Sequence, residues 1–432
     1  MKVLSAEQMR VVDRLTTERH GIPGLQLMEN AAASVADETL KSYGPFEGKQ
    51  MLVVCGRGNN GGDGAAVARL LHEVGARVHV VLLGRIGDSK GDARINFERA
   101  RSLASNNPTT FVLAEASNAD EFDIATGPKN YDLYFDALFG TGLARPAEGI
   151  YRHAIEFLNG RRGKAHSQGS RNLPAMVAVD IPSGLASDSA ETIGPAVRAD
   201  LTVTLTAPKL ANVLPPACYY GGRLVVRNIG SPDDLIESRA SHLNLIDEPM
   251  VTSFLRDSRR RPDANKGDAG KVLIIAGSAG KTGAACLAGE AAMRSGAGLV
   301  TVATAESSQP VVASRLLIEC MTEPLAETPS GAISVDAVRA ALELAKARDV
   351  FAIGPGIGSS DSSTRDFVHD MVSNRIRPLV LDADGLNALA PWPDSMKGSP
   401  ELPIVLTPHP GEMARLAASS IAEILRDRVD AA

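Results

Sequence analysis

Short runs rich in valine, isoleucine and leucine alternate with segments of helical periodicity along most of the 432-residue chain. In the first half, the apolar runs predict strands at residues 51–55, 77–83, 131–136, 175–181, 200–205 and 223–227. The periodic segments predict helices at residues 25–42, 64–75, 89–105 and 149–159, after an amphipathic N-terminal helix with a capping box from Ser5 to Gln8. This alternation is typical of parallel sheets covered by helices on both faces.

A polar segment at residues 231–265 interrupts the alternation, so we expect a linker there between a domain at residues 1–230 and a second at 266–432. The second series predicts strands at residues 271–276, 298–304, 349–353, 378–382 and 404–406, and helices at 284–295, 334–347 and 361–374. The halves share no repeat beyond this alternation. The predicted fold class is therefore α/β with two domains.

The composition narrows the class of protein. Hydrophobic residues make up 44% and charged residues 22% of the chain, which is typical of a soluble globular protein. The net charge is −6 and no long basic patch exists, so nucleic acid is not a favoured partner. No apolar run approaches the ~20 residues of a membrane span, and the N-terminus lacks a signal-peptide core. The four cysteines are widely spaced without zinc-site spacing, which favours a reducing compartment, so we expect a cytoplasmic protein without membrane contact.

The apolar run at residues 51–55 leads directly into GRGNNGGDG, which begins with the GxGxxG outline of a dinucleotide-binding loop. The second predicted strand does not end in the acidic residue that would bind a ribose, but Arg85 could bind a 2′-phosphate there. A dinucleotide-dependent oxidoreductase is therefore one interpretation. Asn59, Asn60 and Asp63 favour another, a loop whose N–H groups bind a phosphate while side-chain oxygens point inward.

Polar residues also follow two further predicted strands. Asp136 stands at the end of one and precedes a glycine-rich loop at residues 140–146, and Asp180 and Ser183 follow another. Because ligands of open α/β sheets gather at the carboxyl ends of strands, we expect these residues to converge with Asn60.

Several of these motifs resemble a known family. The N-terminal half resembles NAD(P)H-hydrate epimerases over roughly residues 1–230, on the motifs LMENAA (27–32), GRGNNGGDG (56–64), FDALFGTGL (135–143) and VDIPSG (179–184). The second half resembles ADP-dependent NAD(P)H-hydrate dehydratases, on KGDAGKVLIIAGS (266–278), GAACLAGEAAMRSGAGLV (283–300), IGPGIG (353–358), LDADGLNAL (381–389) and LTPHPGEMARL (406–416). Together the halves are similar to the bifunctional nicotinamide-nucleotide repair enzymes.

The resemblance implies a Rossmann-like doubly wound sheet followed by a ribokinase-like domain. It implies a small-molecule substrate, NADH or NADPH hydrated at nicotinamide C6. The first activity interconverts the R and S hydrates, and the second removes water from the S form with ADP or ATP and Mg²⁺. We also expect a homo-oligomer.

Position by position, the resemblance implies that Asp180 is the catalytic residue near the reacting carbon. It implies a K⁺ ion held by Asn60, Asp136 and Ser183, whose oxygen ligands suit a hard cation. The implied substrate-binding residues are Asn59, Asn60, Gly61, Gly62, Asp63, Gly140, Thr141, Gly142, Leu143, Ala144, Arg145, Pro146 and Asp180 in the first half, and Ala284, Gly356 and His409 in the second.

The second half departs from familiar patterns at several points. GSAGKTG (277–283) is not a Walker A motif, because Ile275 stands where that motif needs its first glycine. Asn265 replaces a histidine that the family commonly has before Lys-Gly. Asp384 and Asn387 follow a predicted strand and could line a phosphate site.

The family continues after the 409–416 motif with a Lys-Gly strand and a Gly-Ser-Gly-Asp loop, which supplies an anion hole and a general base. This sequence ends at Ala432 without that loop, so we expect an incomplete dehydratase domain with crippled dehydration, and Asp384 is the first candidate for a substitute base. We favour an epimerase with such a second domain. The alternatives are a dinucleotide-dependent oxidoreductase and a non-catalytic nucleotide-binding protein.

Overall fold

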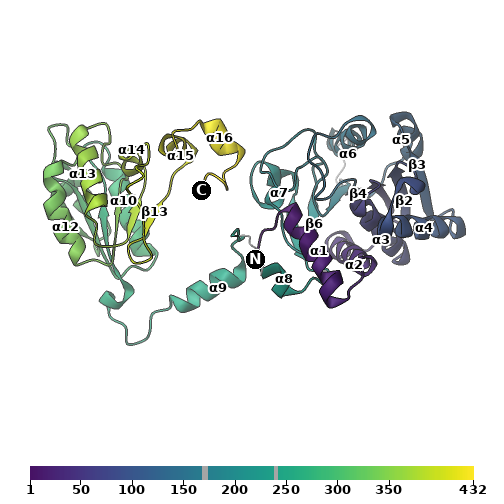
Figure 1. Ribbon diagram of the computed structural model, residues 1–432, viewed down its shortest axis with the longest axis horizontal. Coiled ribbons are helices and arrows are strands. Elements are labelled where there is room, and N and C mark those ends of the chain that lie inside the picture. The colour runs from purple at the N-terminus through teal and green to yellow at the C-terminus, as the bar shows by residue number, and fades with distance from the viewer. Residues whose placement is uncertain (168–173, 238–241) are drawn as a thin grey trace. The chain divides into compact units, whose positions relative to one another are not determined.

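The computed structural model describes residues 1–167, 174–237 and 242–432 (Figure 1). The chain divides into two compact units, Met1–Val251 and Thr252–Ala432, and each contains its own parallel sheet. In the described ranges, no helix combines the length and apolar character that crossing a membrane requires.

The first unit is built on a seven-stranded sheet in the order β3-β2-β1-β4-β5-β6-β7, with every neighbouring pair parallel. Its strands are β1 (Gln50–Cys55), β2 (Arg77–Leu83), β3 (Phe111–Ala116), β4 (Leu133–Ala137), β5 (Ala175–Val179), β6 (Leu201–Leu205) and β7 (Arg223–Arg227). The strand order reverses between β1 and β4. In doubly wound sheets, this reversal opens a crevice at the carboxyl ends of the strands.

Helices cover both faces of this sheet. One face packs against α2, α3 and α4, and the other against α5 and α6, because successive strand residues point to opposite faces. The helices are α1 (Ala6–His20), α2 (Gly24–Tyr43), α3 (Asn59–Glu73), α4 (Gly91–Asn106), α5 (Ala119–Thr126), α6 (Gly149–Ser167), α7 (Leu210–Val213) and α8 (Asp233–Glu237), with the 3₁₀ turns η1 (Ile86–Asp88) and η2 (Ala217–Tyr220).

The second unit repeats this strand order in a six-stranded parallel sheet, β10-β9-β8-β11-β12-β13. The strands are β8 (Lys271–Ile275), β9 (Leu299–Ala305), β10 (Met321–Leu325), β11 (Val350–Ile353), β12 (Leu379–Leu381) and β13 (Ile404–Leu406). The helices α10 (Thr282–Arg294) and α11 (Gln309–Arg315) cover one face, and α12 (Val338–Lys346) and α13 (Ser362–Ser373) cover the other. The remaining elements are α9 (Glu248–Asp257), α14 (Asp384–Ala388), α15 (Pro410–Leu416), α16 (Ile421–Arg426), η3 (Lys266–Ala269), η4 (Glu306–Ser308) and η5 (Val335–Ala337).

The predicted fold class, α/β with two parallel sheets, is confirmed. The structure adds the edge strands β3 and β10, which the sequence did not predict. It also places the helices α8 and α9 within residues 231–265, where we expected a linker. The units divide between Val251 and Thr252, inside that same segment.

One local prediction was wrong. We expected a loop at residues 59–63 and a helix from residue 64, but α3 begins at Asn59. A Cβ on Gly61 would lie 1.8 Å from the carbonyl oxygen of Gly56, and one on Gly64 would lie 2.4 Å from the Cβ of Ala137. These glycines therefore let the first turns of α3 lie directly against the ends of β1 and β4.

Candidate active site

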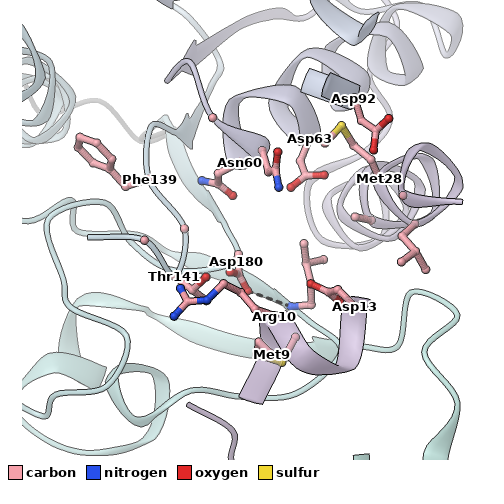
Figure 2. A pocket seen from close by; sticks show the side chains of 18 of the residues that line it. Met9, Arg10, Asp13, Met28, Asn60, Asp63, Asp92, Phe139, Thr141 and Asp180 are labelled. Carbon is pink, nitrogen blue, oxygen red and sulfur yellow. Dashed lines mark hydrogen bonds between the residues drawn. The ribbon is translucent and has the colours of Figure 1, made fainter. Parts of the chain in front are cut away.

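A cavity of about 600 Å³ opens where the strand order of the first unit reverses (Figure 2). Its walls include the residues directly after β1 (57–60), after β4 (138–142) and after β5 (Asp180). Helices α1 and α2 supply another wall, with Asp13 and Met28 among its side chains. Three strand ends therefore share one cavity.

The N-terminus of α3 lies on the wall of this cavity. Gly58 precedes the helix and provides no side-chain hydrogen bond to it, and Asn59 and Asn60 begin its first turn. The first N–H groups of an α-helix have no partner within the helix, and the helix dipole places partial positive charge there. Arg57 adds a cationic side chain beside this end. This wall can bind an anionic group such as a phosphate.

Asn60 has unused hydrogen-bonding capacity. Its side chain is buried, at 8% exposure, and neither its amide oxygen nor its amide nitrogen has a partner in the described residues. A Cβ on Gly140 would lie 3.5 Å from the Cγ of Asn60 and 3.3 Å from Oδ2 of Asp180, so the three residues adjoin. Buried amides are ordinarily hydrogen-bonded, so this amide indicates a ligand position.

Asp136 and Ser183 lie together beneath the loops after β4 and β5. Asp136 is fully buried, and its carboxylate accepts hydrogen bonds from the Ser183 hydroxyl (2.6 Å), the Ser183 N–H (2.7 Å) and the Leu138 N–H (3.2 Å). Burial raises the pKa of Asp136 to about 6, although the hydrogen bonds from Ser183 and Leu138 oppose the rise. The described residues give this carboxylate no cationic partner. A bound cation would supply the missing charge.

Hydrogen bonds fix one carboxylate oxygen of Asp180 and leave the other without a partner in the described residues. It adopts a left-handed backbone conformation, with φ of 68°, which is rare for a residue with a side chain and is concentrated at functional sites. Its Oδ1 accepts hydrogen bonds from the Thr204 hydroxyl (3.0 Å), the Leu205 N–H (3.2 Å) and the Lys209 ammonium. Its Oδ2 accepts none from the described residues and faces Gly140. That oxygen is available to a substrate.

Three more carboxylates, those of Asp13, Asp63 and Asp92, line the same cavity (Figure 2). Asp63 on α3 is 8% exposed and forms no hydrogen bond within the described residues. Burial, followed by the charges of Asp180 and Asp13, raises its pKa well above the ordinary value, while Lys209 opposes the rise. Burial likewise raises the pKa of Asp13 on α1 to about 6, against the lowering effect of Lys209. The inner part of the cavity therefore has carboxyl groups able to hold protons near neutral pH.

Not every residue proposed for this site lines the cavity. Asn59, Asn60, Asp63, Gly140, Thr141, Gly142 and Asp180 do. The lining in the described residues does not include Gly61, Gly62, Leu143, Ala144, Arg145 or Pro146, and Asp136 and Ser183 lie behind it. Arg85 also lies elsewhere. Its guanidinium bonds the Glu121 carboxylate at 3.0 Å, so it is not positioned as the 2′-phosphate ligand that the oxidoreductase interpretation required.

Sequence reasoning missed Asp13 and Lys209. Asp13 lies on the N-terminal helix, outside every recognised motif, and its Oδ1 is buried without a hydrogen-bond partner among the residues that the structure describes. Lys209 lies in a loop after β6 and is 1% exposed. A lysine in a loop is ordinarily exposed, so no sequence signal distinguishes it.

The second unit has a corresponding group of polar residues where its own strand order reverses, between β8 and β11. A Cβ on Gly356, after β11, would lie 3.1 Å from the Cβ of Ala284 on α10 and 3.1 Å from that of Lys281. The predicted residues Ala284 and Gly356 are therefore neighbours. Lys281 forms an ion pair of 3.0 Å with Asp384.

Asp384 ties together the loops of this second group. Its carboxylate accepts hydrogen bonds from the Gly358 N–H and the Ser359 hydroxyl, both at 3.0 Å, besides Lys281. Burial raises its pKa, but the bonds from Gly358, Lys281 and Ser359 together lower it below the ordinary value. Asp384 is thus a charged anchor for the loop after β11 in this arrangement.

His409 stands at the carboxyl end of β13, two strands from β11. Its Nδ1 accepts a hydrogen bond from the Gly411 N–H at 3.0 Å and so caps α15, and its Nε2 lies 3.2 Å from Oε1 of Glu412. The side chain is 62% exposed. The cap fixes the ring while leaving it open to a ligand.

Comparison with known proteins gives matches over both units. Residues 24–211 match the family described as "YjeF-related protein N-terminus", and residues 272–432 match "NAD(P)H-hydrate dehydratase". The bifunctional NAD(P)H-hydrate repair enzyme Nnr of Moorella thermoacetica is 40% identical, with 100% of this chain and 78% of that protein covered. The protein of the same name from Thermofilum pendens is 37% identical, with coverages of 100% and 77%. A solved ADP/ATP-dependent NAD(P)H-hydrate dehydratase from Bacillus subtilis is 30% identical over 40% of this chain and 56% of its own, with a TM-score of 0.32.

Proposed function

Because the chain belongs to the family of bifunctional NAD(P)H-hydrate repair enzymes, we propose that the cavity of its first unit interconverts the R and S forms of hydrated NADH and NADPH. The family's two activities, epimerisation and dehydration of the hydrate, repair the damaged coenzyme. We also propose roles for individual residues in these reactions.

The proposal of epimerisation rests on the carboxylate oxygen of Asp180 that faces the cavity. Epimerisation at C6 requires a bond from C6, either to its hydroxyl group or to the ring nitrogen, to break and then form again on the opposite face of the ring. Either route needs a group that takes a proton from the hydroxyl group or gives one to it. Asp180 presents one uncommitted carboxylate oxygen to the cavity while the other is fixed by hydrogen bonds. We assign the proton transfer to that oxygen.

The charge distribution supports one orientation of the substrate. The N-terminus of α3 and Arg57 form the side of the cavity that suits the pyrophosphate. Asp13 and Asp180, on other elements of the lining, suit the nicotinamide ring, which gains positive charge if its C6 hydroxyl group leaves.

A potassium ion fits the residues beside Asp180. Asn60 has an unpartnered amide oxygen, and Asp136 is a buried carboxylate without a cationic partner in the described residues. With the Ser183 hydroxyl they form an oxygen-only donor set, which is what a hard cation prefers. We propose that Asn60, Asp136 and Ser183 hold K⁺, which would neutralise Asp136 and keep the loops after β4 and β5 in place.

For the second unit, we propose that Ala284, Gly356 and His409 bind the hydrate and that dehydration uses ADP or ATP with Mg²⁺. The adjacency of Ala284 and Gly356 at the reversal between β8 and β11 supports this placement. We also propose a cytoplasmic location, because Cys55, Cys218, Cys286 and Cys320 are all free thiols.

The experiment separates the two activities by leaving out the nucleotide. The full chain is incubated with pure S hydrate in potassium buffer without ADP or ATP, and the R hydrate is followed by chromatography. The proposal predicts approach to an R/S mixture much faster than in buffer alone. An enzyme-independent rate would refute it, and hydride transfer to an added carbonyl substrate would favour the oxidoreductase alternative.

A further inference from the structure

Lys209 is a fully buried lysine whose ammonium group is entirely committed. Its side chain is 1% exposed, and Nζ donates hydrogen bonds to Oδ1 of Asp180, to the Thr204 hydroxyl (3.1 Å) and to the Leu205 carbonyl (2.9 Å). An ammonium group has three protons, so these three bonds use all of them. Lys209 therefore has no proton left for a substrate in this arrangement.

Burying an ammonium group is costly unless a charged partner compensates it. The carboxylate that pairs with Lys209 is Asp180, and Asp13 and Asp63 also feel its charge. An apolar side chain would satisfy packing at this position more cheaply. The lysine is thus explained by what it does to Asp180.

The contacts of Asp180 show how Lys209 acts on it. Its Oδ1 accepts from Lys209, Thr204 and Leu205, while its carbonyl oxygen accepts from the Asn212 amide at 3.3 Å. These bonds fix the backbone and one carboxylate oxygen. They leave Oδ2 as the oxygen directed toward Gly140 and the cavity.

We infer that Lys209 is a positioning residue for epimerisation, which holds the Asp180 carboxylate in the single orientation that presents Oδ2 to the C6 hydroxyl group of the hydrate. The inference rests on the proposed role of Asp180. Lys209 acts through Asp180 and does not touch the substrate.

The test is a double-mutant cycle in the full chain, with the single variants Lys209→Met and Asp180→Asn and the double variant. We expect Lys209→Met to lower kcat for R/S exchange by ~10²-fold, because a misplaced reacting group costs about that much, with KM changed less than about threefold. The double variant should be no slower than Asp180→Asn alone, since residues that act as a unit are not additive. It should also melt at a higher temperature than Lys209→Met, which leaves Asp180 buried without its partner.

Lys49→Met is the matched control, because Lys49 donates to the Tyr43 carbonyl at 2.7 Å outside the cavity lining of the described residues. It should keep the wild-type kcat. If Lys209→Met does not fold, Thr204→Val tests the positioning of Asp180 instead. It removes one bond to Oδ1 while keeping the side-chain shape, and should lower kcat about tenfold at constant KM.

Three results would overturn the inference. The first is a kcat of Lys209→Met within about threefold of wild type, and the second is such a kcat for folded Thr204→Val. The third is a double variant that is slower than Asp180→Asn by the same factor by which Lys209→Met slows the wild type. If the wild-type chain does not exchange R and S hydrates at all, the proposed function fails and this inference fails with it. Normal wild-type exchange with an unaffected Lys209→Met variant would refute the role of Lys209 alone.

Discussion

Replacing Asp13 by asparagine should stabilise the first unit, and more so at higher pH. Burial raises the pKa of Asp13 from 3.8 to about 6 in the folded protein. Between those values the folded state binds a proton that the unfolded state does not, so the free energy of unfolding falls as pH rises from about 4 to above 6. Asparagine resembles the protonated side chain and removes this loss.

The size of the effect follows from the two pKa values. The difference between 3.8 and about 6 corresponds to about 3 kcal/mol, at about 1.4 kcal/mol per pH unit, and it is fully present above pH 7. About half of this destabilisation develops between pH 5 and pH 8. The advantage of Asp13→Asn over wild type should therefore grow by about 1 to 2 kcal/mol over that interval.

Urea unfolding measures the free energy of unfolding of the first unit, provided that its transition is distinguished from that of the second unit. The chain has one tryptophan, Trp392, and it packs in the core of the second unit. Tryptophan fluorescence thus follows the second unit, while circular dichroism follows both, and the transition seen only by dichroism belongs to the first.

Asp361→Asn is the control. Hydrogen bonds, chiefly from Ser330, lower the pKa of Asp361, so its effect should not vary between pH 5 and 8. An advantage of Asp13→Asn that is constant or shrinks as pH rises would refute the burial argument for Asp13.

Four other substitutions test the packing and the two sites. Gly61→Ala should destabilise the first unit by ~3 kcal/mol or more in urea unfolding, because its Cβ would lie 1.8 Å from the Gly56 carbonyl oxygen, whereas Gly58→Ala, with open space, should not. Wild-type epimerisation should be faster in potassium than in choline buffer, and Asp136→Asn should abolish that difference. Asp384→Asn should lower whatever nucleotide-dependent dehydration the chain shows by at least about tenfold, because it loosens the loop after β11, and an unchanged rate would exclude a role of Asp384 in that reaction.

The parts of the fold that follow from local pattern could be predicted from the sequence. Buried central strands such as β1 and β8 are continuous apolar runs, and their spacing indicated two parallel sheets. The edge strands β3 and β10 escaped prediction because they are only partly buried and carry polar residues, and β10 also includes Pro324. The start of α3 was misplaced because glycines there reflect close packing against β1 and β4, a tertiary cause that local propensity does not contain.

Some residues of the candidate site could likewise be predicted from the sequence, and others could not. Asn60, Asp136 and Asp180 could be found because each stands at a strand end in a recognisable motif. Asp13 and Lys209 could not, because their importance arises from burial beside Asp180, between segments nearly 200 residues apart. A charged residue in a helix or loop is ordinarily a solvated one, and only the structure identifies these two as exceptions.

Asp180→Asn is the sharpest test of whether Asp180 transfers the proton in epimerisation. Asparagine keeps the shape and an acceptor oxygen for Thr204, Leu205 and Lys209, but it cannot exchange a proton in the same way. The rate of R/S exchange by the full chain, started from the S hydrate without nucleotide, should fall by ~10²-fold or more, while the dichroism spectrum is unchanged. A folded variant that exchanges the hydrates at a near wild-type rate would contradict the claim.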